Sequence, residues 1–452
     1  MQASAMRLIR TNSRKDGQPR RVVATPESIK DIEDVLTNME RYPSPLRPAG
    51  SASASTRCNH IQQGTLLDMR HMNRLLRMTD GTVTVQAGMR LRDLAQALAD
   101  EGMELLGGCE LPDRTVGGAV SSGALTAGAT GEGGTLASSV EHVTLITADG
   151  KRMEISPKLP DLMRIARLSY GLLGVIALVT FRIRPIEPYE MRHSKFSMNE
   201  FAELVPDLEQ INSGVKFYLF PFRDKAYVEL RCASTDDRKA NALSWKIKDW
   251  ATNSALPAFV HHVGRIVPIG KIRDPLIDGV GEITQSFLNT SMMSTGSNAA
   301  EQSGRFHGVN VDKQNTYSTW VFPASKFVEV LPAYREFCKD HYEEFGFRCD
   351  LPASGFRINQ DRNALMSPTQ NEAGFALTVK ATHTAGWENY ALEYADFASR
   401  FGGVPLFNQS KSFTPEHVKA AFGEALQQFR VMRERMDPDG RFRNQFFLQH
   451  VG

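Results

Sequence analysis

The most constraining feature of the sequence is a glycine-rich segment that extends from Gly102 to Gly134. A second run of small residues, Pro48-Ala-Gly-Ser-Ala-Ser-Ala-Ser55, follows an expected short strand. Small residues let backbone N–H groups approach an anion closely, as in a phosphate-binding nest. Neither segment has the G-x-G-x-x-G or G-x-x-x-x-G-K-[ST] spacing, so Rossmann and P-loop sites are excluded. One such segment alone would fit a tight loop, but two favour a ligand that lies along the backbone.

Composition limits the class of protein. The 452 residues correspond to about two or three domains. A net charge of +2 provides no global attraction to nucleic acid or to a membrane, so neither is expected as a partner. Five scattered cysteines without a C-x-x-C pair exclude a disulfide framework and a zinc site, and no metal is expected. The basic N-terminus lacks an apolar signal core, and residues 170–181 are too short to cross a bilayer, which predicts a cytoplasmic protein.

Hydrophobic patterns divide the chain into blocks of different character. Short strands and helices alternate up to Pro185 and Pro188, which end a long apolar strand. Helix starts are expected at Thr25-Pro26-Glu27 and Thr414-Pro415-Glu416, where an N-cap residue precedes a proline. Further strands, many rich in aromatic residues, are predicted at 216–222, 226–230, 316–322, 355–359 and 375–380. These blocks of strands and helices predict an α+β domain on a largely antiparallel sheet.

Several motifs occur in a fixed order along the chain. They are Arg47-Pro-Ala-Gly-Ser51, Thr115–Gly123, Leu136–Val140, Leu145–Gly150, Tyr170–Ile176, Lys411 and Asp437–Asn444. In this order they resemble the vanillyl-alcohol-oxidase-type (PCMH-type) FAD flavoproteins, and within them the branch of sugar-1,4-lactone oxidases and alditol oxidases. Each motif alone is weak, but the series is specific and covers nearly the whole chain.

The resemblance implies an α+β fold with a two-part FAD-binding domain of the PCMH type, residues 1–187 and 405–452. A cap domain, residues 188–404, would be inserted between the two parts and built on a mainly antiparallel sheet. The first small-residue run would wrap the pyrophosphate, and the glycine-rich segment would line the flavin and its phosphates. The implied cofactor-binding residues are Pro48, Ala49, Gly50, Ser51, Ala52, Ser53, Thr115, Gly117, Gly118, Ser121, Ser122, Gly123, Gly128, Ser138, Gly174, Ile176 and Asn444.

One departure from the family pattern concerns the bond to the cofactor. Oxidases of this branch usually carry Gly-Ser-Gly-His-Ser in the first loop, and that histidine binds the flavin covalently. Here Ser53 stands in its place, so non-covalent FAD is expected. His60 is out of register for such a bond, and Cys109 fits better as a free buried thiol.

Comparison with the family implies two catalytic cations, Arg357 and Lys411. Arg357 precedes Ser367-Pro368 at the family's spacing, and Lys411 follows a proline-led segment that begins at Pro405. The arginine would stabilise developing negative charge, and a lysine with a depressed pKa would take the hydroxyl proton. The alternative for each is an ordinary surface charge or ion pair.

The rest of the relatives' substrate pocket is altered. Their Glu two residues before the arginine is Gly355 here, and Thr378 is nearest to their His. His383 and Trp387 would enter from just beyond. The aromatic residues Tyr218, Phe220, Phe222 and Trp320 would form a larger apolar site or, as the alternative, pack within the sheet.

The predicted function is that of an FAD-dependent oxidase or dehydrogenase. It would transfer a hydride from a CH–OH group of a sugar, lactone or related metabolite to flavin N5, with O2 or another compound as electron acceptor. Oxidation of a C–N or activated C–C bond, and a flavin-binding scaffold without turnover, remain alternatives. A monomer or homodimer is expected. Residues 240–290 would form packed cap helices or, alternatively, an amphipathic, membrane-touching or mobile lid.

Overall fold

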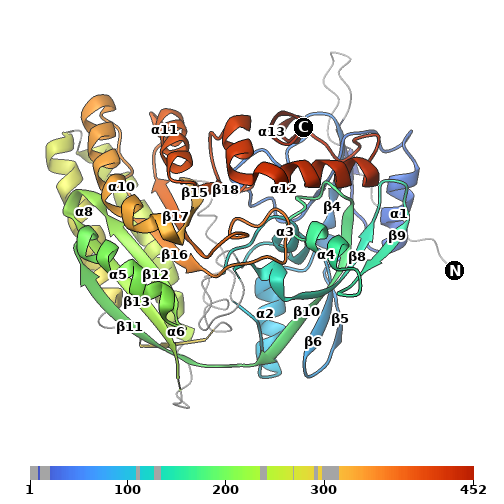
Figure 1. Cartoon of the computed structure of the whole chain (residues 1–452), viewed down its shortest axis with the longest axis horizontal. Coiled ribbons are helices and arrows are strands. Elements are labelled where there is room, and N and C mark those ends of the chain that lie inside the picture. Colours follow the sequence, from blue (N-terminus) through green and yellow to red (C-terminus); the bar gives the residue numbers. More distant parts are fainter. Residues whose placement is uncertain are drawn as a thin grey trace.

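Three β-sheets and the helices around them make up the molecule (Figure 1). The computed structural model describes residues 9–10, 21–107, 112–126, 134–234, 242–267, 269–289, 294–297 and 315–452. Two sheets belong to the N-terminal region, whose strands lie within residues 9–10 and 21–185, and the third belongs to the central region, residues 189–405. Strand β10 (Val175–Pro185) leads directly into β11 (Tyr189–Phe196), so the two regions are joined by neighbouring strands. The end of the chain then returns to the N-terminal region (Figure 1).

The first sheet is small and mixed. Its strands, in the order β1-β2-β4-β3, are β1 (Ile9–Arg10), β2 (Arg21–Ala24), β4 (Gly64–Asp68) and β3 (Leu46–Ala49). The helix α1 (Ile29–Thr37) follows β2 and buries Ile32, Val35 and Leu36. Its N-cap is Ser28, whose hydroxyl accepts from Asp31 N while Asp31 Oδ2 accepts from Ser28 N. The expected start at Thr25 is therefore wrong, because the capping box lies just beyond it.

The second sheet is antiparallel and built around β10, the apolar strand that the sequence predicts. Its path is β5 (Leu75–Met78), β6 (Thr82–Gln86), β10, β8 (Val140–Ile146) and β9 (Arg152–Ile155), and β7 (Met103–Leu105) pairs with the end of β10. Helices α2 (Leu91–Asp100), α3 (Val116–Ser121) and α4 (Pro160–Ala166) and the 3-10 turns η1 (Met69–His71) and η2 (Leu136–Ser139) connect these strands. Val175, Ile176 and Ala177 at the start of β10 are all buried, whereas from Leu178 to Ile183 buried residues alternate with more exposed ones, so one face of this part of the strand packs in the core.

The third sheet confirms the prediction of a largely antiparallel central region. Its order is β14-β11-β13-β12-β16-β17-β15-β18, with all pairs antiparallel. The strands not yet given are β12 (Gly214–Phe220), β13 (Lys225–Ala233), β14 (Thr295–Gly296), β15 (Thr316–Pro323), β16 (Ala353–Ile358), β17 (Gly374–Ala381) and β18 (Val404–Pro405). Helices α5 (Met198–Gln210), α10 (Ala324–Phe345) and α11 (Trp387–Arg400) pack against it. A cluster of Phe217, Phe327 and Phe375 joins α10 to the sheet.

A further group of helices covers the β11–β13 end of this sheet. It comprises α6 (Ala242–Trp250), a π-helical turn (Ala251–Ala255), α7 (Leu256–Ile266) and α8 (Gly270–Phe287). Lys248 of α6 donates to Glu229 Oε2 of β13 at 2.6 Å, and Arg231 donates to Glu229 Oε1 at 2.9 Å, with all three residues buried. The buried Trp245 lies beside both cations. For α6, the packed alternative therefore holds.

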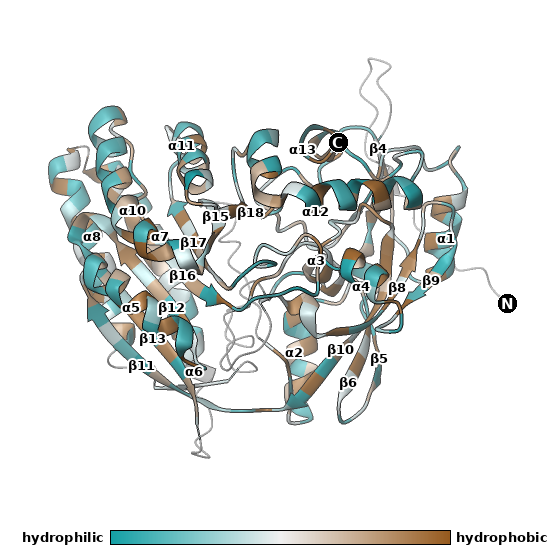
Figure 2. Cartoon of the chain, viewed as in Figure 1, coloured by the Kyte–Doolittle hydropathy of each residue, from teal (hydrophilic) through white to brown (hydrophobic). Residues whose placement is uncertain are grey.

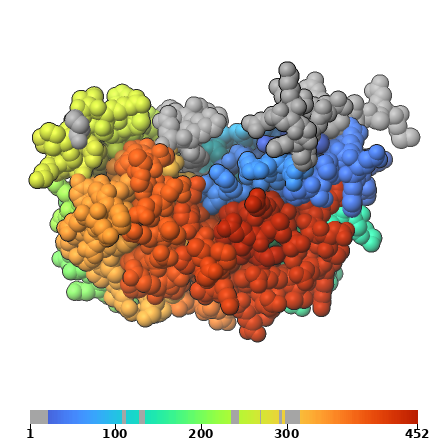
Figure 3. Space-filling view, turned by 90° about the horizontal axis from the view of Figure 1, so that it is seen from above, coloured from blue at the N-terminus to red at the C-terminus, as the bar shows by residue number. Residues whose placement is uncertain are grey.

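The C-terminal helices α12 (Pro415–Met436) and α13 (Gln445–His450) lie against the N-terminal region (Figure 3). The predicted start of α12 is confirmed, since Thr414 caps it. The buried Arg441 donates to the carbonyls of Leu36, Val35 and Tyr42, and Arg47 donates to Phe442 O at 2.8 Å. Residues almost four hundred positions apart thus share one core. Within the described residues, no helix combines the length and apolarity needed to cross a membrane.

Candidate cofactor and active site

A pocket in the N-terminal region brings together ten of the predicted cofactor-binding residues. Its empty volume is about 560 Å³. The end of β3, the start of α3 and the loop before β10 supply most of its wall. The predicted residues in this wall are Pro48, Ala49, Gly50, Thr115, Gly117, Gly118, Ser121, Ser122, Gly174 and Ile176.

Close approach of backbone segments explains why glycines occur in this wall. A Cβ at Gly50 would overlap Thr115 Oγ1, and one at Gly117 would lie 2.9 Å from the Ala87 Cβ. Gly174 has a φ of +154°, and its Cβ would lie 2.5 Å from Ile146 O. These distances are shorter than side chains tolerate. Glycine at these positions therefore lets the segments of the wall, which we call the cradle, pack directly against one another.

The first small-residue run also offers free hydrogen-bond donors. Among the described residues, no protein acceptor takes the backbone N–H of Ser51, Ala52, Ser53 or Gly118. Ala52 has a φ of +54°, the left-handed conformation that turns successive N–H groups toward one point. Donors of this kind, next to a cradle of small residues, fit the diphosphate of a dinucleotide.

Among the residues that the structure describes, the other predicted cofactor-binding residues are not in the wall of this pocket: Ser51, Ala52, Ser53, Gly123, Ser138 and Asn444. Gly123 follows α3 with a φ of +63°, and Ser138 Oγ donates to Thr135 O at 2.7 Å. Asn444 caps α13, and its side-chain amide donates to the carbonyls of Cys58 and His60 at 2.9 Å. It therefore ties the C-terminal segment to the loop that follows the first small-residue run. Gly128 and Cys109 lie outside the described residues.

Sequence reasoning missed several residues of the wall, namely Cys58, Asn59, Met69, Ala87, Tyr170 and Gly171. Behind it, Arg47 donates to Tyr170 O at 2.5 Å and to Gly171 O at 3.2 Å, and burial lowers its pKa to about 10. Arg47 and Tyr170-Gly171 belong to two of the motifs quoted from the sequence. The arginine directly before the small-residue run is the sequence feature that could have indicated Tyr170 and Gly171, because its side chain binds their carbonyls.

Lys411 lies between this pocket and the sheet of the central region. Its backbone N donates to Ser318 Oγ of β15 at 2.9 Å. The preceding segment reaches the pocket, because Asn408 Nδ2 donates to Ser122 Oγ at 3.2 Å and Phe407 O accepts from Thr56 Oγ1 at 2.6 Å. Burial lowers the pKa of the Lys411 ammonium, with Glu388 opposing that shift and Arg57 adding to it.

Arg357 occupies a different place. Its guanidinium donates to Ile211 O and Ser213 O, both at 2.9 Å, and to Leu208 O, so it binds the carbonyls at the end of α5. Burial lowers its pKa, and Glu209 opposes that shift. It is not part of the wall around Gly50. Lys411 is not part of that wall either, and the hydrogen bonds of Arg357 and Lys411 involve different segments of the chain.

The altered pocket positions have physical explanations. A Cβ at Gly355 would overlap the Phe217 ring and Ala376 O, so a Glu has no room at this position. The Thr378 hydroxyl pairs with Thr319 Oγ1 at 2.8 Å. His383 pairs with Asp350 at 3.0 Å, and Trp387 is buried beside Tyr390. None of these side chains lines the wall around Gly50.

The aromatic candidates follow the alternative interpretation, packing within the protein. Tyr218 and Phe220 form a buried cluster with Tyr227, and the Trp320 ring contacts His417. Phe222 lies under the Arg348 guanidinium, 3.9 Å from ring centroid to Cζ.

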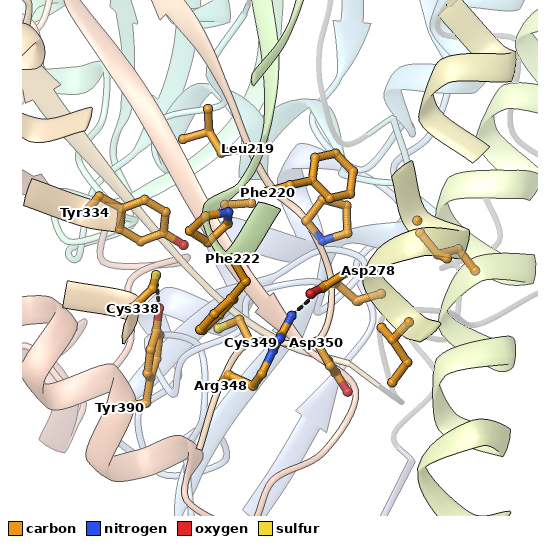
Figure 4. A pocket seen from close by; sticks show the side chains of 17 residues that line it. Leu219, Phe220, Phe222, Asp278, Tyr334, Cys338, Arg348, Cys349, Asp350 and Tyr390 are labelled. Carbon is orange, nitrogen blue, oxygen red and sulfur yellow. Dashed lines mark hydrogen bonds and ion pairs between the residues drawn. The ribbon is translucent and has the colours of Figure 1, made fainter. Parts of the chain in front are cut away.

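Phe220 and Phe222 also line a second cavity (Figure 4). This cavity shares no residue with the wall around Gly50. The end of β12 and helices α8, α10 and α11 surround it. Arg348 is paired with Asp278, and Cys338 Sγ lies 3.8 Å from Tyr390 Oη (Figure 4). Burial raises the pKa of the Cys338 thiol to about 11, so it is not a reactive thiolate.

Comparison with known proteins agrees with this architecture. A model of the FAD binding domain matches residues 20–156, and a model of D-arabinono-1,4-lactone oxidase matches residues 179–450. L-gulonolactone oxidase from Mus musculus is 23% identical over 430 residues, which cover 93% of each chain. L-gulono-1,4-lactone dehydrogenase from Mycobacterium tuberculosis is 21% identical and covers 95% of this chain and 96% of its own.

The solved structures support the fold. Cholesterol oxidase from Brevibacterium sterolicum superposes with a TM-score of 0.78 at 15% identity, covering 96% of this chain and 94% of that chain. The predicted α+β fold of the PCMH type is thereby confirmed. The family and the function of an FAD-dependent oxidoreductase are confirmed by the two family models and by the lactone oxidases and dehydrogenases. Because the second family model spans more than half of the residues, the chain belongs to the D-arabinono-1,4-lactone oxidase family.

Proposed function

We propose that this protein oxidises a CH–OH group of a sugar-1,4-lactone to a carbonyl. The observation that carries the proposal is the pocket of small residues and free N–H groups, together with the half-buried Lys411 three residues after Asn408, whose side chain bonds the wall residue Ser122. The relatives' names, which include gulonolactone and arabinonolactone oxidases, support a lactone substrate. Such an oxidation removes a hydroxyl proton and a hydride from the substrate.

The pocket around Gly50 fits FAD, which when bound supplies the two-electron acceptor. The N–H groups of Ser51, Ala52, Ser53 and Gly118 would hold the diphosphate. Ser121, Ser122, Gly174 and Ile176 would line the rest of the cofactor, and Gly123, Gly128 and Ser138 remain proposals on the strength of their motifs. Asn444 would act by positioning the loop between Cys58 and His60. The proposed limits of the FAD domain remain 1–187 and 405–452, with the cap at 188–404.

Lys411 would hold and accept the hydroxyl proton. A neutral amine is required for this step, and burial favours the neutral form. Arg357, which the family comparison makes a second catalytic cation, is supported here as a positioning residue, because its donors bind the end of α5. Asn408 would orient Ser122 in the pocket wall.

We further propose that the FAD is non-covalent, since Ser53 stands where relatives carry the linking histidine. Acid precipitation of the purified protein tests this point. The yellow flavin is expected in the supernatant, and flavin that stays in the pellet would show a covalent bond.

Cys58, Cys232, Cys338 and Cys349 form no disulfide bond, which supports a cytoplasmic location. We also propose that O2 or another compound accepts the electrons from the flavin. The protein would be a monomer or a homodimer.

The decisive experiment is anaerobic bleaching of the flavin by a panel of 1,4-lactones, alditols and amines, followed by admission of air. Bleaching by a lactone is expected. Bleaching by amines alone would instead indicate C–N oxidation, and purified protein without flavin absorbance would indicate a scaffold. Recovery of colour in air would identify O2 as an acceptor, whereas persistent bleaching would indicate another oxidant.

A further inference from the structure

Arg114 is a buried cation next to the pocket around Gly50. It directly precedes Thr115, whose side chain fills the space beside Gly50 in the wall of the cradle. Only 4% of Arg114 is exposed. Figure 2 shows α3, which begins two residues after Arg114, in the interior of the N-terminal region and without strongly hydrophilic colour. The positive charge of Arg114 therefore lies in surroundings that offer it little water.

The guanidinium of Arg114 has no partner among the described residues. Its Nη2 is buried and donates to no acceptor, and no carboxylate of the described residues forms an ion pair with it. Asp113, its neighbour in sequence, pairs with Arg92 instead, at 2.7 Å. A buried charge is costly unless it is paired. An anionic ligand beside Arg114 would remove this cost.

Other deeply buried arginines find their partners within the protein. Among the described residues, the other arginines that are at most 7% exposed each bind a carboxylate or a backbone carbonyl. They are Arg47, Arg231, Arg357, Arg433 and Arg441. The chain thus supplies a partner where an arginine is buried for a structural reason, and Arg114 departs from this pattern.

Two wall residues near Arg114 are not charged enough to serve as its counter-ion. Burial raises the pKa of the Cys58 thiol, and the charge of Arg114 opposes this shift only in part. Burial also raises the pKa of the Tyr170 hydroxyl, again against the charge of Arg114. Both groups are therefore neutral near pH 7. Because both line the pocket, their electrostatic interaction with Arg114 also places its guanidinium close to the cradle.

We propose that Arg114 binds the diphosphate of FAD. This inference rests on the proposed FAD site, and it adds a charged side chain to a site described so far by its backbone donors. The N–H groups of Ser51, Ala52 and Ser53 would donate hydrogen bonds but carry no net charge, whereas the diphosphate is a dianion. A guanidinium matches phosphate oxygens in both charge and geometry. Arg114 and the diphosphate would each neutralise the other.

The first test measures the FAD affinity of the purified full-length holoprotein. Dilution releases FAD, and the rise in flavin fluorescence gives the Kd. Arg114→Met is expected to raise the Kd at least about thirtyfold, which is the low end for removing one partner of a buried charged pair. A Kd within about threefold of the wild-type value would overturn the proposal.

Two further variants separate a direct contact from a general field. Arg90 is partly exposed and lies in the segment that pairs with Thr115, so Arg90→Met removes a cation from the same region and should change the Kd by less than about twofold. An equal loss in Arg90→Met and Arg114→Met would refute a direct contact. Arg114→Lys retains the charge and should bind FAD at least about threefold more tightly than Arg114→Met. Equal affinities of these two variants would show that the charge has no role.

Thermal melting distinguishes a binding role from a structural one. Without FAD, Arg114→Met removes an unpaired buried charge, so its melting temperature should lie above that of the FAD-free wild type. With FAD bound, the order should reverse, because the wild type gains more from the ligand. A structural guanidinium would instead make the variant less stable in both states.

Two last measurements locate the contact on the cofactor. ADP carries the diphosphate without the flavin, and its Kd, obtained by competition with FAD, should rise in Arg114→Met. The midpoint potential of the flavin should stay at the wild-type value. Unchanged ADP affinity with a lowered potential would place Arg114 at the isoalloxazine ring and overturn the assignment to the diphosphate. None of these readouts uses a lactone, so failure of this inference can be distinguished from failure of the proposed oxidation.

Discussion

The pocket around Gly50 and the sheet of the central region provide candidate functional groups in different ways. In the pocket, the candidate binding groups are backbone N–H groups, and glycines allow the surrounding segments to pack closely because they lack a side chain. In the sheet, the notable groups are charged side chains, and most of them bind the protein itself, as Arg357 and Glu229 do. A binding pocket formed by backbone groups can be predicted from the sequence, because it requires runs of small residues. The partner of a charged side chain cannot be predicted from the type of residue alone.

Removing the amine of Lys411 is expected to have the largest effect on the pocket side of this comparison. Lys411→Met should slow lactone-dependent flavin reduction about 10²–10⁴-fold, the range for loss of a general base. Stopped-flow reduction under anaerobic conditions measures this. Lys419→Met, an exposed lysine of α12, is the control and should react normally. A Lys411 variant with full activity would remove this residue from the mechanism.

Glu229→Gln tests the sheet side, where a charge acts on stability. Burial raises the pKa of Glu229, but Lys248 and Arg231 outweigh burial and hold it well below its usual range. The variant removes the carboxylate charge that faces the buried cations Lys248 and Arg231, so unfolding should cost about 3–5 kcal/mol less. Urea denaturation measures the loss. In contrast, Glu190→Gln breaks an exposed pair with Arg192 in the same sheet and should change stability by less than about 1 kcal/mol.

Gly50→Ala adds one methyl group where Thr115 already fills the space. Overpacking of this kind costs about 1–3 kcal/mol. We expect the residues around Gly50 to shift and relieve it, and because they form the proposed diphosphate site, FAD binding should weaken roughly tenfold to hundredfold. Titration of the apoprotein with FAD, followed by flavin fluorescence, gives the dissociation constant. At Gly81 a Cβ would meet nothing, so Gly81→Ala serves as the control and should bind FAD normally. Normal FAD affinity in the Gly50 variant would contradict the proposed cradle.

Arg357→Met tests whether this cation stabilises the central region or takes part in the reaction at the pocket. Three carbonyls at the end of α5 lose their donor, which should reduce stability by about 1–3 kcal/mol. The exposed Arg362 provides the control, Arg362→Met, with no expected change. The opposite pattern, unchanged stability with flavin reduction slowed a hundredfold, would restore Arg357 as a catalytic residue.

The smallest expected effect is a shift in pH dependence. Burial disfavours the ammonium form of Lys411, so its pKa lies below the ordinary 10.5 and the neutral amine forms at lower pH than in a free lysine. The rate of flavin reduction should therefore rise with pH and level off below that value. A rate that falls as the pH rises above neutrality would contradict the assignment of Lys411 as base.

The same contrast explains how much the sequence predicts. The two runs of small residues predict a ligand along the backbone because only small residues allow such close approach, and the family resemblance assigns both runs to one FAD site. The antiparallel central sheet and the cap of α12 at Thr414 followed from periodicity and capping chemistry. The direction of Arg357 did not follow, because strand alternation shows which residues share a face but not that α5 covers it. Phe217 filled the place of the missing acid by a pairing between β12 and β16 that lies far apart in sequence.

The long-range bonds of Arg47 and Arg441 have a consequence for the order of assembly. Arg47 lies immediately before the run that is proposed to bind the diphosphate, yet its guanidinium needs the carbonyl of Phe442, and the β3 residue Leu46 donates its N–H to Arg441 O. Domains tend to fold as they leave the ribosome, N-terminal parts first. The FAD-binding region cannot complete its fold in that order, because the residues that support the loop after Arg47, namely Arg441 and Phe442, are translated near the end of the chain. Flavin capture is therefore a late event in synthesis, and a stalled or truncated nascent chain would hold an incomplete cradle.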